Sequence, residues 1–422
     1  MRISEGGRLW GWAFAALLSA ISPAAQAQEG APVTLRSALL AGAKHGPAVT
    51  EAERVRMATD PFANHPGVGL PSVPQVTLLA GARSPNALPV GPEVSLSATQ
   101  EISLRGLGSA RSQAAAWAGR AATSEVERAR LEGAALAALS WINLLEAQTL
   151  MEIRAASVLA AEQISKLAVL RVTSGVATAI ERSLAQAELG SARVDFLDAE
   201  GRATEARLAL AYAMGAPMDR DYRAEGTLDA PENPSAADDR ALAGLDTHPT
   251  VMAAHARAEQ SKAEGQVVRA ANGPTFSVGA SVWREGSGDK AAAGILSFPL
   301  PFFDPSRYDT ARQETLAAAA RGHEVRLRAE LERELRLAMH ERVHTREVRS
   351  HLRSDVVKPL RSAVDTAMAS YSAGTASLET MLLARRAALA AEERLARAKA
   401  DVERADLRAS TLAGSLLRGA QP

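Results

Sequence analysis

The chain has 422 residues, and its 48 Lys and Arg are balanced by 48 Asp and Glu, so the formal net charge is zero at pH 7. That balance gives no electrostatic reason to expect nucleic acid as a partner. The absence of cysteine excludes disulfides, thiol catalysis and Cys-based metal sites. Only 4% of the residues are aromatic although 47% are hydrophobic, and much of this share is alanine, a small and strong helix former. The composition therefore favours long, closely packed helices over a bulky globular core.

Residues 1–27 are predicted to be a secretory signal peptide. Arg2 and Arg8 supply the positive start, residues 10–21 are apolar, and Ala25-Gln26-Ala27 forms a cleavage site of small residues. A retained membrane anchor is the alternative, but the apolar stretch is short. No later apolar run reaches the roughly 18 to 20 residues that a spanning helix needs. A mature chain that enters a membrane is therefore expected to do so as strands.

The remaining sequence reads as two similar halves. Gly175, in VTSGVATAIE, and Gly374, in YSAGTASLET, lie 199 positions apart, and Gly215 and Gly414 repeat the same offset. This period is too long for a solenoid repeat. We expect a first repeat over 28–215, a linker or equatorial segment over 216–245, a second repeat over 246–414 and a C-terminal tail over 415–422.

Each half is predicted to contain a strand hairpin, over about 75–102 and 275–301. Apolar and small residues alternate in TFSVGASVWR (275–284), so that Phe276, Val278 and Val282 share one face. The segment 284–290, rich in Gly and charge, reads as a turn before ILSFPLP (295–301). In the first half a Pro-rich turn separates 75–83 from 93–102.

Long helices follow each hairpin, over about 106–172 and 176–214 and over about 306–371 and 376–413. The longer member of each pair has roughly 66 residues and spans about 100 Å. A heptad of apolar positions, typical of close helix packing, recurs at the same offset in both return helices. Its members are Leu189, Phe196, Ala203 and Leu210 with Ala192, Ala199, Ala206 and Ala213, and Ala388, Leu395, Val402 and Ala409 with Ala391, Ala398, Ala405 and Leu412.

Four strands are too few for a membrane sheet, because open edges in lipid leave backbone groups unpaired and closed barrels have at least eight strands. Three copies would supply twelve. The chain resembles the outer-membrane efflux family (TolC-like) over essentially the whole mature sequence. The order and duplication of three segments carry this resemblance: QEISLRGLGSARSQAA, LSFPLPFFDPSRYDTARQE and YSAGTASLETMLLARRAALAAEERLARA.

The resemblance implies a mainly α fold with a small β part. Three copies would form a homotrimer with a twelve-stranded β-barrel in outer-membrane lipid above a periplasmic tunnel of antiparallel coiled-coil helices. It further implies a passive duct without cofactor or catalysis, served by a periplasmic adaptor (membrane fusion) protein and an inner-membrane pump. SFPLPFFDPSRYD is similar to ducts of heavy-metal cation efflux driven by pumps of the resistance-nodulation-division type. Drug efflux and type I protein secretion stay open as alternatives.

The turns between the long helices are the candidate adaptor-facing tips. Glycine suits such a reversal, where the backbone adopts positive φ, so each glycine also has a purely structural explanation. The predicted tips comprise Val172, Thr173, Ser174, Gly175 and Val176 in the first half, and Ser372, Ala373, Gly374 and Thr375 in the second.

Some family members close the entrance with acidic residues shortly after the second tip. The matching positions here are Thr380 and Leu383, so the sequence departs from that pattern. Glu379 is the nearest acid and Glu181 its counterpart in the first half, and these two are the candidate constriction residues. A solvated helix charge is the alternative explanation for each.

His340, His344 and His351 share one helix face by their spacing. Two histidines at i and i+4 can chelate a metal, but no carboxylate or cysteine completes the set, and a solvated polar face is the favoured explanation. The sequence has no GxSxG, Walker, HExxH or GxGxxG motif, so no enzyme is expected. The alternative function is a soluble periplasmic coiled-coil scaffold or adaptor.

Overall fold

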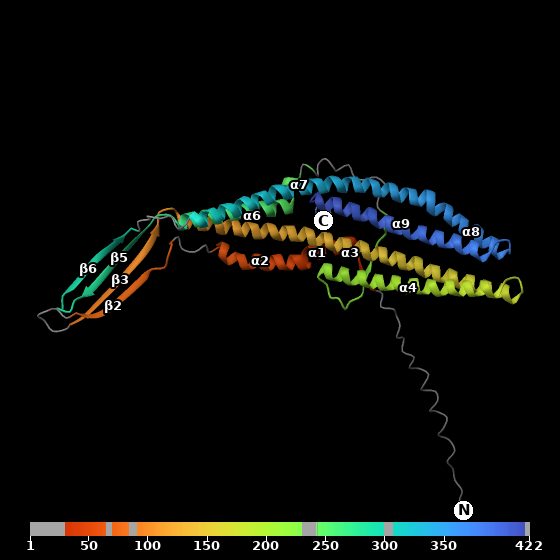
Figure 1. Cartoon of the computed structure of the whole chain (residues 1–422), viewed down its shortest axis with the longest axis horizontal. Helices are drawn as coiled ribbons and strands as arrows, with labels where there is room; N and C mark the ends of the chain where they lie inside the picture. The colour runs from red at the N-terminus through yellow and green to blue at the C-terminus, as the bar shows by residue number, and fades with distance from the viewer. Residues whose placement is uncertain are drawn as a thin grey trace, which may run out of the picture.

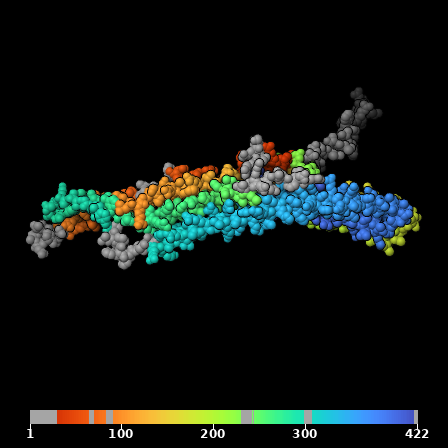
Figure 2. Space-filling model, turned by 90° about the horizontal axis from the view of Figure 1, so that it is seen from above, coloured from red at the N-terminus to blue at the C-terminus, as the bar shows by residue number. Residues whose placement is uncertain are grey.

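The computed structural model describes residues 30–64, 70–83, 91–229, 242, 244–298 and 307–417. The predicted signal peptide and residues 299–301 of the second hairpin lie outside these ranges. The molecule is elongated, with a small sheet at one end and two helical hairpins at the other (Figure 1; Figure 2). A mainly α fold with a small β part was predicted, and this is confirmed.

Four antiparallel strands form the sheet in the order β2-β3-β5-β6. They comprise β2 (Gln75–Arg83), β3 (Gly91–Ser103), β5 (Thr275–Arg284) and β6 (Lys290–Ser297). The central pair, β3 and β5, joins the two halves of the chain, with Ser97 opposite Ser281. β6 begins five residues earlier than the predicted 295, because the turn needs only residues 285–289 and closes with the Glu285 N–H donating to the Asp289 carbonyl at 2.9 Å.

The two faces of the sheet differ in polarity. The register places apolar side chains of all four strands on one face, where they are exposed: Val76, Leu78, Val94, Leu96, Val278, Val282 and Leu296. The other face carries small hydroxyl residues at Thr77, Ser95, Ser97, Thr99, Ser277 and Ser281, with Leu79, Trp283 and Ile295 as large apolar exceptions. The sheet therefore has one face suited to an apolar environment and one suited to water.

The helices run the length of the molecule. The first half contributes α1 (Leu35–His45), α2 (Pro47–Asn64), α3 (Leu107–Thr173) and α4 (Ala179–Met214). The second contributes a 3-10 turn (Leu245–Thr247), α6 (Pro249–Ala271), α7 (Arg307–His351), α8 (Lys358–Ser372) and α9 (Leu378–Leu412). All sixteen predicted heptad positions on α4 and α9 are buried or half-buried, which confirms the close-packed seam.

Short helices stack end to end to form columns beside the long ones. α2 and α4 pack on successive parts of α3, and α6 and α9 pack on both α3 and α7 (Figure 1). Where α4 ends, Gly215 has φ of 63° and lies so close to α1 that a Cβ would overlap the His45 carbonyl. Gly414 ends α9 with the same φ, against His248. The repeated glycines thus allow each return helix to stop directly against the next column.

The helix predicted over about 306–371 needs correction, because it is not one α-helix. A π-helical turn, Leu352–Val357, separates α7 from α8. Pro359 lies in the first turn of α8, where its missing N–H costs little, whereas inside a regular α-helix it would remove a hydrogen bond and clash with the preceding turn. The prediction overlooked this proline.

A small parallel sheet was also missed. β1 (Ala31–Val33) pairs with β4 (Tyr222–Ala224) beside the middle of α3. Trp141 of α3 donates its indole N–H to the Val33 carbonyl at 2.7 Å, and both strands belong to the largest buried cluster. Three-residue strands carry too little periodicity to be read from sequence.

No helix among the described residues is long and apolar enough to cross a membrane.

Candidate functional site at the helix tips

The two helix-turn-helix tips have the same backbone geometry. Gly175 and Gly374 have φ of 75° and 78°, the left-handed conformation that glycine adopts without strain. In the first tip the Gly175 N–H donates to the Val172 carbonyl at 3.1 Å, and in the second the Gly374 N–H donates to the Tyr371 carbonyl at 3.1 Å. Both reversals are therefore tight C-terminal caps.

One contact joins the two tips across 200 positions of sequence. Arg171, at the end of α3, donates from Nη1 to the Tyr371 carbonyl at 2.6 Å. Its guanidinium also lies 4.6 Å from the centre of the Tyr371 ring. This pair, the tip contact, ties the first hairpin to the second at their far end.

Tyr371 is the centre of a small core beneath the tips. Its side chain is fully buried, with Leu378 and Met381 packed in the same cluster. Burial, and then the neighbouring Glu181 carboxylate, raise the pKa of the Tyr371 hydroxyl, so it stays protonated at neutral pH. Its O–H lies 3.4 Å from the Glu181 Oε2, a long hydrogen bond.

The two candidate constriction acids differ in position. Glu181 is half-buried and faces Tyr371, whereas Glu379 is exposed in the first turn of α9. The matching position Thr380 donates its backbone N–H to the Ser377 side chain at 3.2 Å, an N-cap. Leu383 is 71% exposed. The structure thus brings Glu181, but not Glu379, into the contact between the tips.

Sequence reasoning missed Arg171 and Tyr371. The only available signal was that Tyr371, one of four tyrosines, directly precedes the second predicted tip. The cationic partner lies 200 positions away, so no local pattern could have paired them.

The tips also expose large apolar side chains. Val176 and Ile180 of the first hairpin are 66% and 70% exposed, and Leu170 and Leu383 are similarly open. Several exposed apolar residues at one end of a molecule are typical of an interaction surface.

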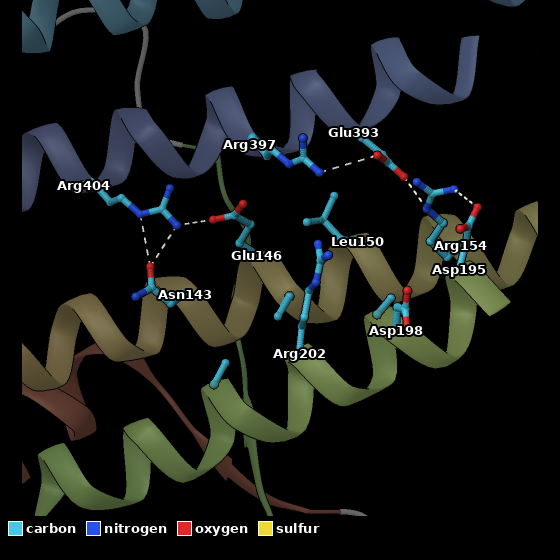
Figure 3. A pocket seen from close by; sticks show the side chains of 13 residues that line it. Asn143, Glu146, Leu150, Arg154, Asp195, Asp198, Arg202, Glu393, Arg397 and Arg404 are labelled. Carbon is cyan, nitrogen blue, oxygen red and sulfur yellow. Dashed lines mark hydrogen bonds and ion pairs between the residues drawn. The ribbon is translucent and has the colours of Figure 1, made fainter. Parts of the chain in front are cut away.

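A charged groove of about 410 Å³ lies farther from the tips, between α3, α4 and α9 (Figure 3). Arg154 bonds Asp195 at 2.8 Å and contacts Glu393 at 2.5 Å, while Arg404 pairs with Glu146. Acidic and basic side chains are balanced within it, so the network mainly ties α9 of the second half to α3 and α4 of the first.

The histidine face gains no metal site from the fold. His340 and His344 stack with ring centres 6.3 Å apart, and His351 bonds Asp355 at 2.8 Å. Within the described ranges, no group of three or more His, Asp or Glu side chains is placed to hold a metal ion.

Comparison with known proteins finds a family that matches part of the chain. Residues 243–415 match the family described as "Outer membrane efflux protein". This part of the chain is similar to the outer membrane efflux proteins. The predicted resemblance is thus confirmed for residues 243–415.

Two curated efflux relatives are each 27% identical. One is the cobalt-zinc-cadmium resistance protein CzcC of Cupriavidus metallidurans, matched over 56% of this chain and 56% of its own. The other is the pyoverdine export outer membrane protein OpmQ of Pseudomonas aeruginosa, matched over 66% of this chain and 62% of its own. The matches thus span less than two thirds of either relative.

The fold is shared more widely than the sequence. The outer-membrane channel OprN superimposes with a TM-score of 0.75 at 18% identity, covering 90% of both chains. This similarity extends to the first half of the chain, which the family match does not reach.

Proposed function

We propose that this protein is the outer-membrane duct of a tripartite efflux system and catalyses no reaction. Substrate would pass through it passively, delivered by an inner-membrane pump through a periplasmic adaptor. The observation that carries the proposal is the pairing of a two-faced four-stranded sheet with helical hairpins at the opposite end of the molecule (Figure 1).

The apolar face of the sheet supports insertion into lipid. Seven large apolar side chains from all four strands are exposed on this face. Their exposure to water is unfavourable in free energy, and contact with lipid would remove that penalty. Phe276 and Phe298 stack on the same face, with ring centres 6.1 Å apart. The strands have 8 to 13 residues, close to the ~9 to 11 of membrane strands.

The lateral edges support a ring of identical copies. β2, α2 and α4 form one side of the molecule and β6, α7 and α8 the other (Figure 1). On the first side, α4 exposes three large apolar side chains at intervals of two heptads: Ile180, Val194 and Leu208. On the other side, α7 exposes Leu337 and Val343. If one side of each copy contacts the opposite side of the next, rotational symmetry closes the copies into a ring. Three copies would then complete a twelve-stranded barrel.

The tips support an adaptor-binding role. The residues predicted from sequence, Val172–Val176 and Ser372–Thr375, form the end of the molecule farthest from the sheet (Figure 1). Glu181, held against Tyr371, is the better of the two candidate constriction residues, because Glu379 is exposed in the first turn of α9.

Divalent heavy-metal cations are the substrate class we propose first, because CzcC is named for cobalt, zinc and cadmium resistance. We also propose a pump of the resistance-nodulation-division type, because the segment SFPLPFFDPSRYD resembles ducts that serve such pumps. OpmQ, named for pyoverdine export, supports a siderophore-like substrate as the second candidate. Loss of the gene should sensitise cells to cobalt, zinc or cadmium salts; unchanged tolerance of all three would refute the metal assignment.

Fractionation followed by gel mobility tests the duct itself. Processed protein should be in the outer-membrane fraction and should run, unheated in mild detergent, at about three times the monomer mass. The variant Phe298→Asp should lower the yield of this species, whereas Ser281→Asp on the polar face should not. A soluble periplasmic monomer would refute the duct and favour the coiled-coil scaffold.

A further inference from the structure

The apolar face of the four-stranded sheet ends in two positive charges. Arg284 is the last residue of β5 and Lys290 is the first residue of β6, and the two lie directly opposite each other in the strand register. Both lie on the apolar face, in one row with Val94 of β3. The turn between them, residues 285–289, is at the end of the sheet farthest from the helices (Figure 1).

These two cations have no acidic partner in the described part of the chain. No hydrogen bond or ion pair joins the side chain of Arg284 or Lys290 to another described residue. Asp289, the acid that precedes Lys290, accepts the Ser287 hydroxyl at 2.9 Å. Like charges that face each other across a strand pair repel. An anion between the two side chains would remove this repulsion.

An apolar hollow begins beside the cations. Its volume is about 500 Å³, and its lining includes Arg284 and Lys290 at one end and Val94, Leu96 and Val282 along the strands. The three apolar side chains are 44 to 50% exposed, so the hollow is open to the surroundings of the sheet. The site therefore combines two unpaired cations with an apolar surface, which is the pattern that an anionic amphiphile requires.

Small residues continue the hollow along the same face. The next row toward the helices contains Ala98, Ala280 and Gly294. A Cβ at Gly294 would meet no other atom within 4 Å. A hydrocarbon chain that leaves the hollow in this direction can therefore lie directly against the strands and gain dispersion contacts along its length.

The cations lie at the height of a lipid headgroup. Phe276 shares their face near the other end of β5, eight residues from Arg284. Eight residues span about 27 Å along a strand, or about 21 Å along the membrane normal when the strands are tilted by ~40°. The apolar band of a membrane barrel is ~25 Å tall. Arg284 and Lys290 thus lie at its outer border, where long cationic side chains reach anionic headgroups.

We propose that Arg284, Lys290 and the adjoining hollow form a binding site for one outer-leaflet lipid with a phosphomonoester headgroup, of the lipid A class. The phosphate lies between the two cations, and an acyl chain follows the hollow. Arginine binds phosphate through two parallel hydrogen bonds. A phosphomonoester carries about 1.5 to 2 negative charges at neutral pH and so matches two cations better than the single charge of a phosphodiester phospholipid. The inference rests on the proposed function, which places this end of the sheet in the outer leaflet.

Lipid binding to the purified full-length protein tests the site. The protein is exchanged into mild detergent until its lipid is removed, and purified bisphosphorylated lipid A is then titrated and followed by native mass spectrometry. R284Q/K290Q should weaken binding about tenfold or more, because it removes two charged donors to phosphate. R307Q/R312Q is the matched control, since it removes two exposed arginines at the start of α7, beyond the other end of the sheet (Figure 1). These charges are more than a Debye length away, so binding should change less than ~2-fold.

A second variant tests the hollow without changing the charge. Ala292 also lines it, and Ala292→Phe should fill it while the face stays apolar. Binding of lipid A should weaken about fourfold or more, because at least one methylene group of the acyl chain loses its contact. Unaltered affinity would exclude the hollow from the site.

The headgroup is tested with two further lipids. Dephosphorylated lipid A and phosphatidylglycerol should each bind the native protein at least ~10-fold more weakly than lipid A. Equal binding of phosphatidylglycerol and lipid A would overturn the assignment to a phosphomonoester. Unchanged affinity in R284Q/K290Q, or an equal loss in R307Q/R312Q, would overturn the site itself.

Fractionation separates this inference from the proposed function. Protein that is absent from the outer membrane would refute the duct. An outer-membrane trimer whose affinity for lipid A is the same with and without R284Q/K290Q would refute only the lipid site.

Discussion

Replacing Arg171 by Met should loosen the contact between the tips while preserving side-chain length and much of the packing. The substitution removes a charged donor to the Tyr371 carbonyl, worth about 1.5 to 3 kcal/mol, and a cation–π contact of about 1 to 2 kcal/mol. The Tyr371 carbonyl keeps the Gly374 N–H as a donor, so no unpaired acceptor is created.

One unfavourable contribution of Arg171 partly offsets these two stabilising interactions. The Nε of Arg171 is buried without a partner, which costs about 1 to 3 kcal/mol in the native protein and disappears in the variant. The net contribution of Arg171 is therefore about 2 kcal/mol, equivalent to a roughly 30-fold change in an opening equilibrium.

Hydrogen exchange of residues 168–182 and 369–381 measures this change directly. Arg171→Met should lower protection there by about 30-fold. Arg193→Met is the control, because its ion pair with Glu162 lies largely exposed on the same hairpin and contributes at most ~1 kcal/mol. Protection that falls less than ~3-fold in the Arg171 variant, or equally in both, would refute the calculation.

Three further predictions concern stability. Gly215→Ala should lower the melting temperature more than Gly175→Ala. Both glycines have positive φ, which costs ~1 to 2 kcal/mol for alanine, but only at Gly215 would a Cβ also overlap the His45 carbonyl. Equal shifts in melting temperature would contradict this reasoning. Trp141→Phe should cost about 1 kcal/mol in denaturant unfolding, because a buried hydrogen bond to the Val33 carbonyl is lost while that carbonyl keeps the Glu225 N–H as a donor. Trp117→Phe, which removes no such bond, should cost less. His248 accepts the Thr250 N–H at Nδ1 and contacts the Thr411 carbonyl through Nε2, and burial lowers its pKa below 6.5. Because the pKa of His248 is lower in the folded state, the stabilisation by neutral His248 is complete above pH 6.5 and is lost as the pH falls through the folded-state pKa. In His248→Asn the melting temperature should therefore depend less on pH in that range. An unchanged slope would exclude His248 as the cause.

The sequence by itself determined the elements whose pattern is local and long. Alternation in 275–284 predicted β5, and the heptads predicted the buried seam of α4 and α9, because side-chain direction repeats every two or 3.5 residues whatever lies opposite. The duplication located both tips, since glycine at positive φ is needed wherever such a hairpin reverses. Pro359, which lies directly after the π-turn, was also readable in the sequence, and it was overlooked.

Only the tertiary structure decided which elements meet. The pairing of β3 with β5, the parallel β1 and β4, and the contact of Arg171 with Tyr371 join residues more than 170 positions apart. Helix and strand periodicity states which face of each element is apolar but not which partner covers it. That choice depends on side-chain volumes and buried hydrogen bonds that form only when the whole chain packs, and so the tip contact emerged only from the fold.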